Sequence, residues 1–222
     1  MDQDTVSISI DQARSDEFEA LLDLYVDLFF DREPLTTLLG LSRERIISIA
    51  GALYASSKND VLSQGLCWIA RDSAEGGRGV GFIVCDDPTA AGAPRLPEDL
   101  AGREAEMVAA VGALLEEIRR PVKDRLAPGA GKCLHIAGVG VAPGYEGRGI
   151  AGRLLGTALQ AAGSLGFRHA LSECTSVASR RLHEKFGFEC RQSVSTRSIV
   201  VNGSHPFPDR DLEIYLMWKV LD

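Results

Sequence analysis

The sequence predicts an α/β (α+β) fold, with a mixed central sheet of about seven strands flanked by helices. Short segments either alternate apolar with polar residues or form brief apolar runs, as strands do. Between them, longer segments repeat apolar residues at helical spacing. A chain of 222 residues can form one substantial core. We therefore expect residues 1–222 to form a single domain.

The expected strands are of two kinds. Residues 5–10 alternate apolar and polar side chains, which is the period of a half-exposed strand, whereas residues 134–141 are apolar or small throughout, as in a buried strand. A glycine-rich turn over residues 75–79 joins two segments into an antiparallel pair. The expected strands are residues 5–10, 66–70, 80–85, 134–141, 168–173, 188–201 and 211–220.

The expected helices are defined by their apolar spacing and by residues suited to their ends. The first begins at Ser15 or Asp16 and ends at residues 31–34, because the residue before Pro34 is pushed out of helical geometry. Gly187 follows the last helix, in the position where glycine commonly ends one. Further helices are expected over residues 42–53, 104–119, 154–162 and 176–186.

Residues 134–155 join a buried strand to a helix through a glycine-rich turn. Pro143 withdraws a backbone donor and Gly144 permits a turn, so the strand ends there. The first turn of the following helix has unpaired N–H groups and a positive dipole end, which suits a pyrophosphate. A tight turn that only allows close helix–sheet packing would show the same pattern, and both interpretations stay open.

Two common phosphate-binding motifs are excluded in this stretch. A Walker loop requires Gly-Lys-Ser/Thr at the helix start, and the sequence has none there. Gly138 and Gly140 begin a G-x-G-x-x-G pattern, but Pro143 stands where its third glycine belongs.

Two segments resemble motifs of the GNAT N-acetyltransferases. Residues 146–151 resemble the acetyl-CoA loop, Gln/Arg-x-x-Gly-x-Gly/Ala, except that Glu146 stands in the first position. Residues 179–188 resemble the second motif, Ala-x-x-Leu-Tyr-x-Lys-x-Gly-Phe, with Ser179 for Ala and His183 for Tyr. The resemblance implies the GNAT fold, acetyl-CoA as co-substrate and an acetyl-CoA-binding core over residues 132–190.

The same resemblance implies which residues hold acetyl-CoA. The backbone of residues 139–141 would hold the pantetheine arm and offer an N–H to the thioester carbonyl. Residues 147–152 would bind the pyrophosphate, with Arg148 and Arg153 adding charge, although either arginine can equally be a solvated helix residue. The implied cofactor-binding residues are Val139, Gly140, Val141, Gly147, Arg148, Gly149, Ile150, Ala151 and Gly152.

A narrower resemblance concerns the acceptor side, which we expect within residues 1–60. Residues 29–35, FFDREPL, are similar to the F-F-x-D-E-P-L segment of insect-type arylalkylamine (dopamine) N-acetyltransferases, and residues 174–179 resemble their Cys-Ser-Ser-x-Tyr-Ser segment. The resemblance implies Glu33 as general base and the hydroxyls of Thr175 and Ser179 as further site groups. Their alternatives are a solvated loop carboxylate for Glu33 and helix capping for the two hydroxyls.

Three histidines are assessed separately. His183 either protonates the departing thiolate, for which an imidazole pKa near 6.5 is suitable, or is a helix-face histidine. His135 lies in the buried run, and we expect a core histidine there rather than a catalyst. By analogy with the family, the loop over residues 202–210, which contains His205, is expected to border the acceptor pocket.

The resemblance implies an enzyme that transfers acetyl from acetyl-CoA to a primary amine by direct attack, with a small arylalkylamine as the leading acceptor. Another amine, such as a polyamine, an amino acid or an aminoglycoside, stays open because Arg32, Thr175 and Ala178 depart from the subfamily pattern. A non-catalytic acyl-CoA sensor also stays open, because Glu146 and His183 are off-pattern.

Composition excludes several partners and cofactors. The net charge of −7 argues against a nucleic-acid surface and is compatible with a cationic small molecule. No apolar run approaches the ~20 residues that span a bilayer. Five widely spaced cysteines form neither a zinc motif nor a disulfide framework, so we expect no metal and a cytoplasmic location. A monomer and a homodimer both stay open.

Overall fold

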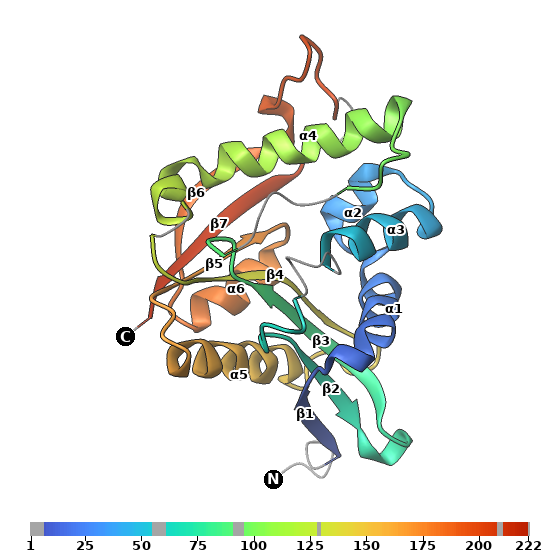
Figure 1. Cartoon of the computed structure of the whole chain (residues 1–222), viewed down its shortest axis with the longest axis vertical. Helices are drawn as coiled ribbons and strands as arrows, with labels where there is room; N and C mark the ends of the chain where they lie inside the picture. Colours follow the sequence, from blue (N-terminus) through green and yellow to red (C-terminus); the bar gives the residue numbers. More distant parts are fainter. Residues whose placement is uncertain (1–6, 55–60, 91–95, 128–129, 208–210, 222) are drawn as a thin grey trace.

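The computed structural model describes residues 7–54, 61–90, 96–127, 130–207 and 211–221. Within these residues, seven strands form one sheet in the order β1-β2-β3-β4-β5-β7-β6. Helices flank the sheet, as Figure 1 shows. The predicted single-domain α/β fold with a mixed central sheet is confirmed.

Each predicted strand is present, with its ends moved by a few residues. All neighbouring strands are antiparallel except β4 and β5, which are parallel. The extended segment predicted over residues 188–201 divides into β6 and a short 3-10 turn at Thr196–Ser198. Residues 5–6 of the first predicted strand lie outside the described residues. The strands are β1 Ile8–Gln12, β2 Trp68–Asp72, β3 Arg78–Asp86, β4 Cys133–Val141, β5 His169–Cys174, β6 Glu189–Ser195 and β7 Glu213–Val220.

One described α-helix, α2, was not predicted. It begins at Pro34, where proline has no N–H to lose, and the Glu33 side chain caps it by accepting from the N–H groups of Leu35 and Thr36. Pro34 therefore separates α1 from α2 instead of beginning a loop. The helices are α1 Phe18–Phe29, α2 Pro34–Leu39, α3 Arg43–Tyr54, α4 Gly102–Arg119, α5 Ile150–Ser164 and α6 Val177–Lys185.

Helices α1 and α5 cover opposite faces of the sheet. Neighbouring residues of β3 point to opposite faces. Phe82 lies against Phe29 of α1, with 5.1 Å between ring centroids. A Cβ on Gly81 would meet Ile150 of α5 at 3.4 Å. Helix α4 packs against β6 and β7 around a second core, visible across the top of Figure 1.

Two glycines of β4 permit the close approach of α1. A Cβ on Gly138 would lie 3.1 Å from Phe29, and one on Gly140 would lie 2.6 Å from Phe82. Larger residues at these positions would push the aromatic rings of α1 and β3 away from β4. The incomplete G-x-G-x-x-G pattern thus has a packing explanation.

The parallel strands β4 and β5 separate after three residue pairs. Cys133, Leu134 and His135 pair with residues 169–171, and the Ser172 hydroxyl then donates to the Ile136 carbonyl at 3.0 Å. Within the described structure, residues 137–141 of β4 have no partner in β5. This divergence leaves backbone N–H and C=O groups of β4 available on one side.

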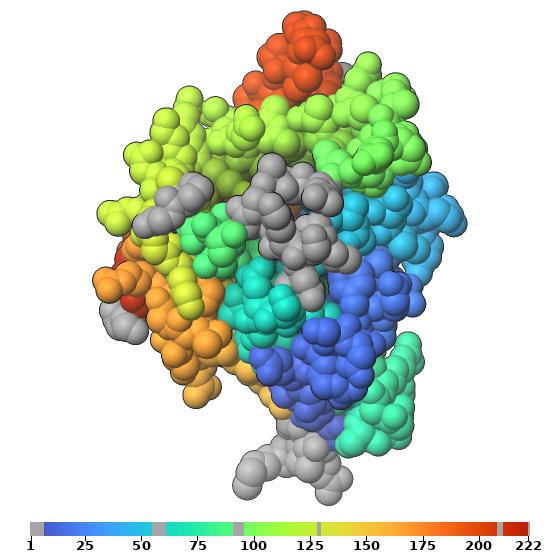
Figure 2. All heavy atoms as spheres, viewed as in Figure 1, coloured from blue at the N-terminus to red at the C-terminus, as the bar shows by residue number. Residues whose placement is uncertain are grey.

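Helices α2 and α3 adjoin the start of α4 on one face of the molecule. In Figure 2 the light-blue atoms of this region adjoin the green atoms at the start of α4. Arg45 of α3 forms ion pairs with Glu104 of α4 at 2.9 Å and with Asp99, which precedes α4, at 3.0 Å. These helices form a wall opposite the point where β4 and β5 diverge.

Candidate active site

A cavity of about 900 Å³ opens where β4 and β5 separate. Its lining comes from helices α1 to α4, from strands β3, β4 and β5, and from the starts of α5 and α6. Glu33, Thr175 and Ser179, three of the four predicted catalytic residues, line it. The fold therefore brings the N-terminal segment and the end of β5 to one space.

The Glu33 carboxylate accepts four hydrogen bonds. Its Oε1 accepts from Leu35 N at 3.0 Å and from Thr175 Oγ1 at 2.6 Å. Its Oε2 accepts from Thr36 N at 2.5 Å and from Thr36 Oγ1 at 2.7 Å. A carboxylate has about four lone-pair sites, so these contacts orient it completely. Glu33 is thus a helix N-cap as well as the partner of Thr175, rather than a solvated loop residue.

Ser179 and Ser176 occupy the start of α6. Ser176 is the N-cap, and its hydroxyl accepts from Ser179 N at 3.1 Å. The Ser179 hydroxyl donates to Cys174 Sγ at 3.2 Å. The capping role considered for Thr175 and Ser179 therefore belongs to Ser176, and both of the other residues line the cavity.

His183 lies away from the cavity. Its side chain is 0% exposed, its ring meets Phe188 edge-on at 5.0 Å, and it is not among the lining residues. Its Nδ1 donates to the Ser179 carbonyl at 2.9 Å, and burial lowers its pKa. This placement supports a helix-face histidine, and we do not carry the proton-donor hypothesis further.

The predicted cofactor residues divide into two groups. Val139, Gly140, Val141 and Ala151 line the cavity. The side chain of Ile150 is buried in the core, and a Cβ on Gly152 would lie 3.7 Å from Phe186 of α6, so only the backbone N–H groups of these two residues are candidates for cofactor binding.

The turn before α5 fits a phosphate group. Gly147 and Gly149 have φ of 74° and 76°, and a Cβ at either would meet nothing within 4 Å. No side chain of the described residues caps α5 at its N-cap, Gly149, so its first N–H groups remain available. The open space, the free N–H groups and the diverging edge of β4 together suit the phosphates and the pantetheine arm of acetyl-CoA.

The two arginines predicted near this turn point elsewhere. The Arg148 guanidinium lies over the Tyr145 ring, 5.0 Å from its centroid. Arg153 donates from Nη2 to the Ile8 carbonyl at 2.8 Å and so anchors β1. Neither is among the residues that line the cavity.

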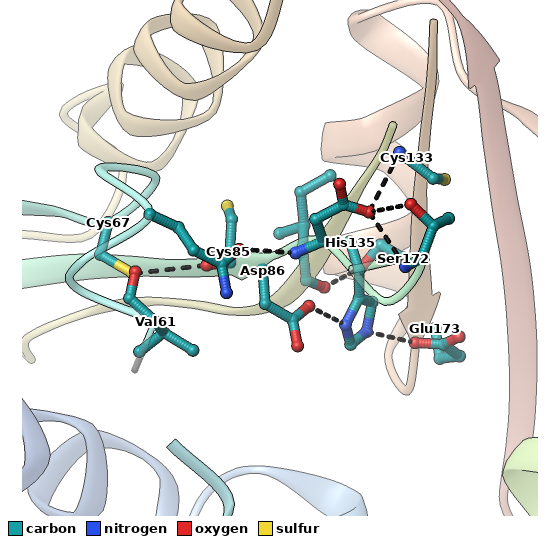
Figure 3. A network of polar contacts seen from close by, with 12 residues as sticks. Val61, Cys67, Cys85, Asp86, Cys133, His135, Ser172 and Glu173 are labelled. Atoms are coloured by element: carbon teal, nitrogen blue, oxygen red, sulfur yellow. Dashed lines mark hydrogen bonds and ion pairs between the residues drawn. The ribbon is translucent and has the colours of Figure 1, made fainter. Parts of the chain in front are cut away.

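A charged network that the sequence analysis did not predict also lines the cavity. His135 Nδ1 lies 2.7 Å from Asp86 Oδ1, and His135 Nε2 lies 3.0 Å from Glu173 Oε2. Figure 3 shows the ring between the two carboxylates. Arg119 of α4 donates from Nε to Glu173 Oε1 at 2.6 Å. His135 is mostly buried, as expected, but it borders the cavity instead of lying wholly in the core.

One sequence signal could have found this network. His135 is a polar residue inside the run predicted as a buried strand, and such a group needs partners. Asp86 and Arg119 carry no such signal, since each stands at the end of its element. Only the meeting of β3, α4, β4 and β5 identifies them.

The network shifts the pKa values of His135 and Glu173. Burial alone would lower the pKa of His135, but the charges of Asp86 and Glu173 raise it to about 9. Burial alone would raise the pKa of Glu173, but Arg119 and His135 hold it well below its usual range. At neutral pH the network therefore contains two anions and two cations.

The raised pKa of His135 predicts a pH-dependent stability. A folded-state pKa of about 9, against about 6.5 in the unfolded chain, stabilises the fold fully below pH 6.5. That contribution, up to about 3 kcal/mol, is lost as pH rises through 9. Urea unfolding between pH 6 and 9.5 should show the decline, and it should be much smaller in His135→Gln. His205→Gln, which alters a histidine outside the network, should retain it; an unchanged decline in His135→Gln would contradict the assignment.

Three further observations delimit the site. Among the described residues, no group of three His, Cys, Asp or Glu side chains is placed to hold a metal ion, and both ring nitrogens of His135 already face carboxylates. No α-helix within the described ranges has the length and apolar character to cross a bilayer. Residues 202–207 do not line the cavity, contrary to expectation, and residues 208–210 lie outside the described structure.

The fold resembles solved structures along nearly its whole length. The C-terminal condensation domain of Ebony, in complex with β-alanyl-dopamine, superposes with a TM-score of 0.78 at 19% identity, covering 96% of this chain and 98% of that one. A Drosophila melanogaster polyamine N-acetyltransferase that forms N-acetylagmatine gives 0.71 at 22% identity, with 96% and 100% covered. The mosquito protein arylalkylamine N-acetyltransferase-like 5b gives a TM-score of 0.70 at 22% identity, covering 97% of this chain and 100% of that one.

The family assignment rests on the sequence match. Residues 9–188 match the model of the Acetyltransferase (GNAT) family, and this range includes Glu33, β4, the glycine-rich turn, Thr175 and α6. The chain therefore belongs to the GNAT acetyltransferase family and is an acetyl-CoA-dependent N-acetyltransferase.

Proposed function

We propose that this N-acetyltransferase acetylates a small primary arylalkylamine, and that Glu33 accepts the amine proton through the Thr175 hydroxyl. The observation that carries the acceptor class is the charge balance of the cavity. The geometry of Glu33 and Thr175 supports the proton path.

The described lining of the cavity has one carboxylate more than it has basic groups. These side chains are Glu33, Asp86, Glu146, Glu173, Arg32, Arg119 and His135, which is four acids against three bases. Asp86 and Glu173 face His135 and Arg119, and Glu146 pairs with Arg32. Glu33 contacts only neutral N–H and O–H groups among the described residues.

This balance favours an acceptor with one positive charge. A single ammonium beside Glu33 would make the lining neutral. The second cation of a polyamine or of agmatine would meet no carboxylate left unpaired in the described lining, and a desolvated, unpaired charge is costly. An amino acid would add an anion to a lining that already carries a net negative charge.

The remaining wall suits an aromatic or alkyl body. Tyr25, Phe29 and Tyr54 line the cavity and contact one another, with Tyr25 4.7 Å from Phe29 and 5.7 Å from Tyr54 between ring centroids. Apolar side chains of α3 and α4 complete the wall: Ile46, Ile49, Leu53, Val111 and Leu115. An aromatic ring packs well against such a surface.

The proton path follows from the hydrogen bond between Thr175 and Glu33. The Thr175 hydroxyl donates to Glu33 Oε1 at 2.6 Å, so its oxygen keeps lone pairs for an ammonium N–H. As Thr175 takes a proton from the ammonium, it passes its own proton to Glu33. The neutral nitrogen can then attack the thioester carbonyl carbon, forming the C–N bond while the C–S bond breaks. CoA leaves as a thiolate, and it takes up the second proton that the nitrogen loses when the amide forms.

The other predicted residues keep their roles as proposals. Residues 139–141 offer backbone hydrogen bonds to the pantetheine arm, and residues 147–152 offer N–H groups to the phosphates. Ser179 is the hydroxyl that we propose faces the sulfur. A cytoplasmic location is likewise proposed, because the five widely spaced cysteines suggest no disulfide framework.

Free-thiol release from acetyl-CoA with a panel of amines tests the acceptor class. Two pairs of amines each differ by one charge: tyrosine has a carboxylate that tyramine lacks, and putrescine has a second ammonium that isoamylamine lacks. We expect kcat/KM to fall by about 100-fold for each added charge, and arylalkylamines to lead the panel. A preference for agmatine or spermidine would refute the proposed class. Binding of acetyl-CoA without turnover of any amine would refute catalysis by this chain.

A further inference from the structure

Arg32 and Glu146 form an ion pair at the mouth of the cavity. Arg32, in the linker between α1 and α2, pairs through Nη2 with Glu146 in the turn before α5. Its Nη1 donates to the Val141 carbonyl at 3.4 Å. Both side chains line the cavity, yet they are 41% and 58% exposed, which places them at its opening. The pair joins the acceptor-side segment to the phosphate-binding turn.

A contribution to stability does not account for this pair. Exposed ion pairs contribute about 0–1 kcal/mol. Both residues depart from the patterns that their segments otherwise resemble, with a base at 32 in place of an acid and an acid at 146 in place of a base or glutamine. The two residues that depart from the patterns contact each other. Relative to those patterns, the acidic and the basic position have changed places.

Glu146 alone would oppose phosphate binding. Its carboxylate lies in the turn that precedes the α5 N-terminus, where the phosphates would be bound. The negative charge of the carboxylate would repel the negative charge of the phosphates. Arg148 lies over Tyr145, and Arg153 is bonded to the Ile8 carbonyl. Arg119, the other arginine among the described lining residues, is bonded to Glu173. Arg32 is therefore the guanidinium placed to offset Glu146.

We propose that Arg32 supplies, from the acceptor side of the cleft, the positive charge that binds the phosphate-bearing arm of acetyl-CoA, and that Glu146 holds Arg32 in position. A guanidinium has five N–H donors, and the two contacts described use two of them, so donors remain for a phosphate oxygen. This inference rests on the use of acetyl-CoA and not on the proposed acceptor.

Calorimetric titration of CoA into single variants tests the proposal without any acceptor. Arg32→Ala leaves the Glu146 charge uncompensated and should weaken CoA binding by about tenfold. Glu146→Gln removes a negative charge, while the amide oxygen of the glutamine can still accept a hydrogen bond from Arg32 and hold it in position, so binding should be unchanged or tighter. The exchanged pair R32E/E146R should bind within about threefold of the wild type, because the cation returns on the other side.

A matched control and a truncated substrate separate charge from structure. Arg43 and Asp27 form a comparable pair, with 38% and 59% exposure, so Arg43→Ala should leave CoA binding unchanged. With S-acetylpantetheine, which lacks the pyrophosphate, Arg32→Ala should leave KM unchanged. The proposal would be overturned if Arg32→Ala and Glu146→Gln weakened CoA binding equally, or if Arg32→Ala raised KM equally for S-acetylpantetheine and acetyl-CoA. Either result would mean that the pair only holds the two segments together.

Discussion

Glu33→Gln should lower kcat/KM for the best amine by about 10²–10³-fold at pH 7, in the range of a lost general base. An alkylamine of pKa ~10 is almost wholly protonated at that pH, and reaching the neutral form costs about 4 kcal/mol. In the variant, the rate should therefore rise about tenfold per pH unit until the amine itself loses its proton. A pH profile of kcat/KM for both proteins measures this difference.

The Glu33→Gln result must be separated from the loss of a helix cap. A glutamine has one acceptor oxygen, whereas Glu33 accepts with two. The weaker cap of α2 should lower the free energy of unfolding by about 1–2 kcal/mol. This free energy is therefore measured together with the rate. Acetyl-CoA affinity should not change. A variant that keeps its rate to within a few-fold would show that Glu33 serves only as the α2 cap.

The two threonines that donate to Glu33 provide a matched comparison. Thr175→Val and Thr36→Val each remove one hydroxyl donor, from Oε1 and Oε2 respectively. If Thr175 relays the proton, Thr175→Val should lower kcat by at least tenfold more than Thr36→Val. Equal losses would indicate that both hydroxyls only orient the carboxylate.

Glu173→Gln should lower the free energy of unfolding by about 3 kcal/mol, because removing one partner of a buried ion pair leaves the other charge uncompensated. The Glu173 side chain is 7% exposed and bonds to both Arg119 and His135. The neutral amide cannot balance Arg119, and its NH2 group would face one of the two donors. Urea unfolding at pH 7 gives the difference directly.

A surface ion pair at the end of α4 serves as the control for Glu173→Gln. Glu117 pairs with Arg120 at 2.7 Å, and their side chains are 37% and 67% exposed, so Glu117→Gln should cost less than about 1 kcal/mol. The double variant R119Q/E173Q should cost less than the sum of its single variants, since it removes both charges. A loss below 1 kcal/mol for Glu173→Gln would mean that solvent screens the network.

The sequence by itself determined the sheet, five of the six described α-helices and the glycine-rich turn. These features depend on local chemistry: apolar periodicity, backbone donors withdrawn by proline, and glycines that tolerate positive φ. Helix α2 escaped prediction because Pro34 both ends one helix and begins the next. Glu33 and Thr175 were named through resemblance, not through any pattern that places them together.

Only the tertiary structure decided which side chains share the cavity. Thr175 reaches Glu33 across 142 positions, Arg32 reaches Glu146 across 114, and His135 meets Asp86 across 49. Contacts of this kind depend on where strands diverge and helices cross, which residue periodicity does not encode. The same is true of His183: its motif position leaves two roles open, and packing decides that its side chain lies on the buried face of α6, against Phe188.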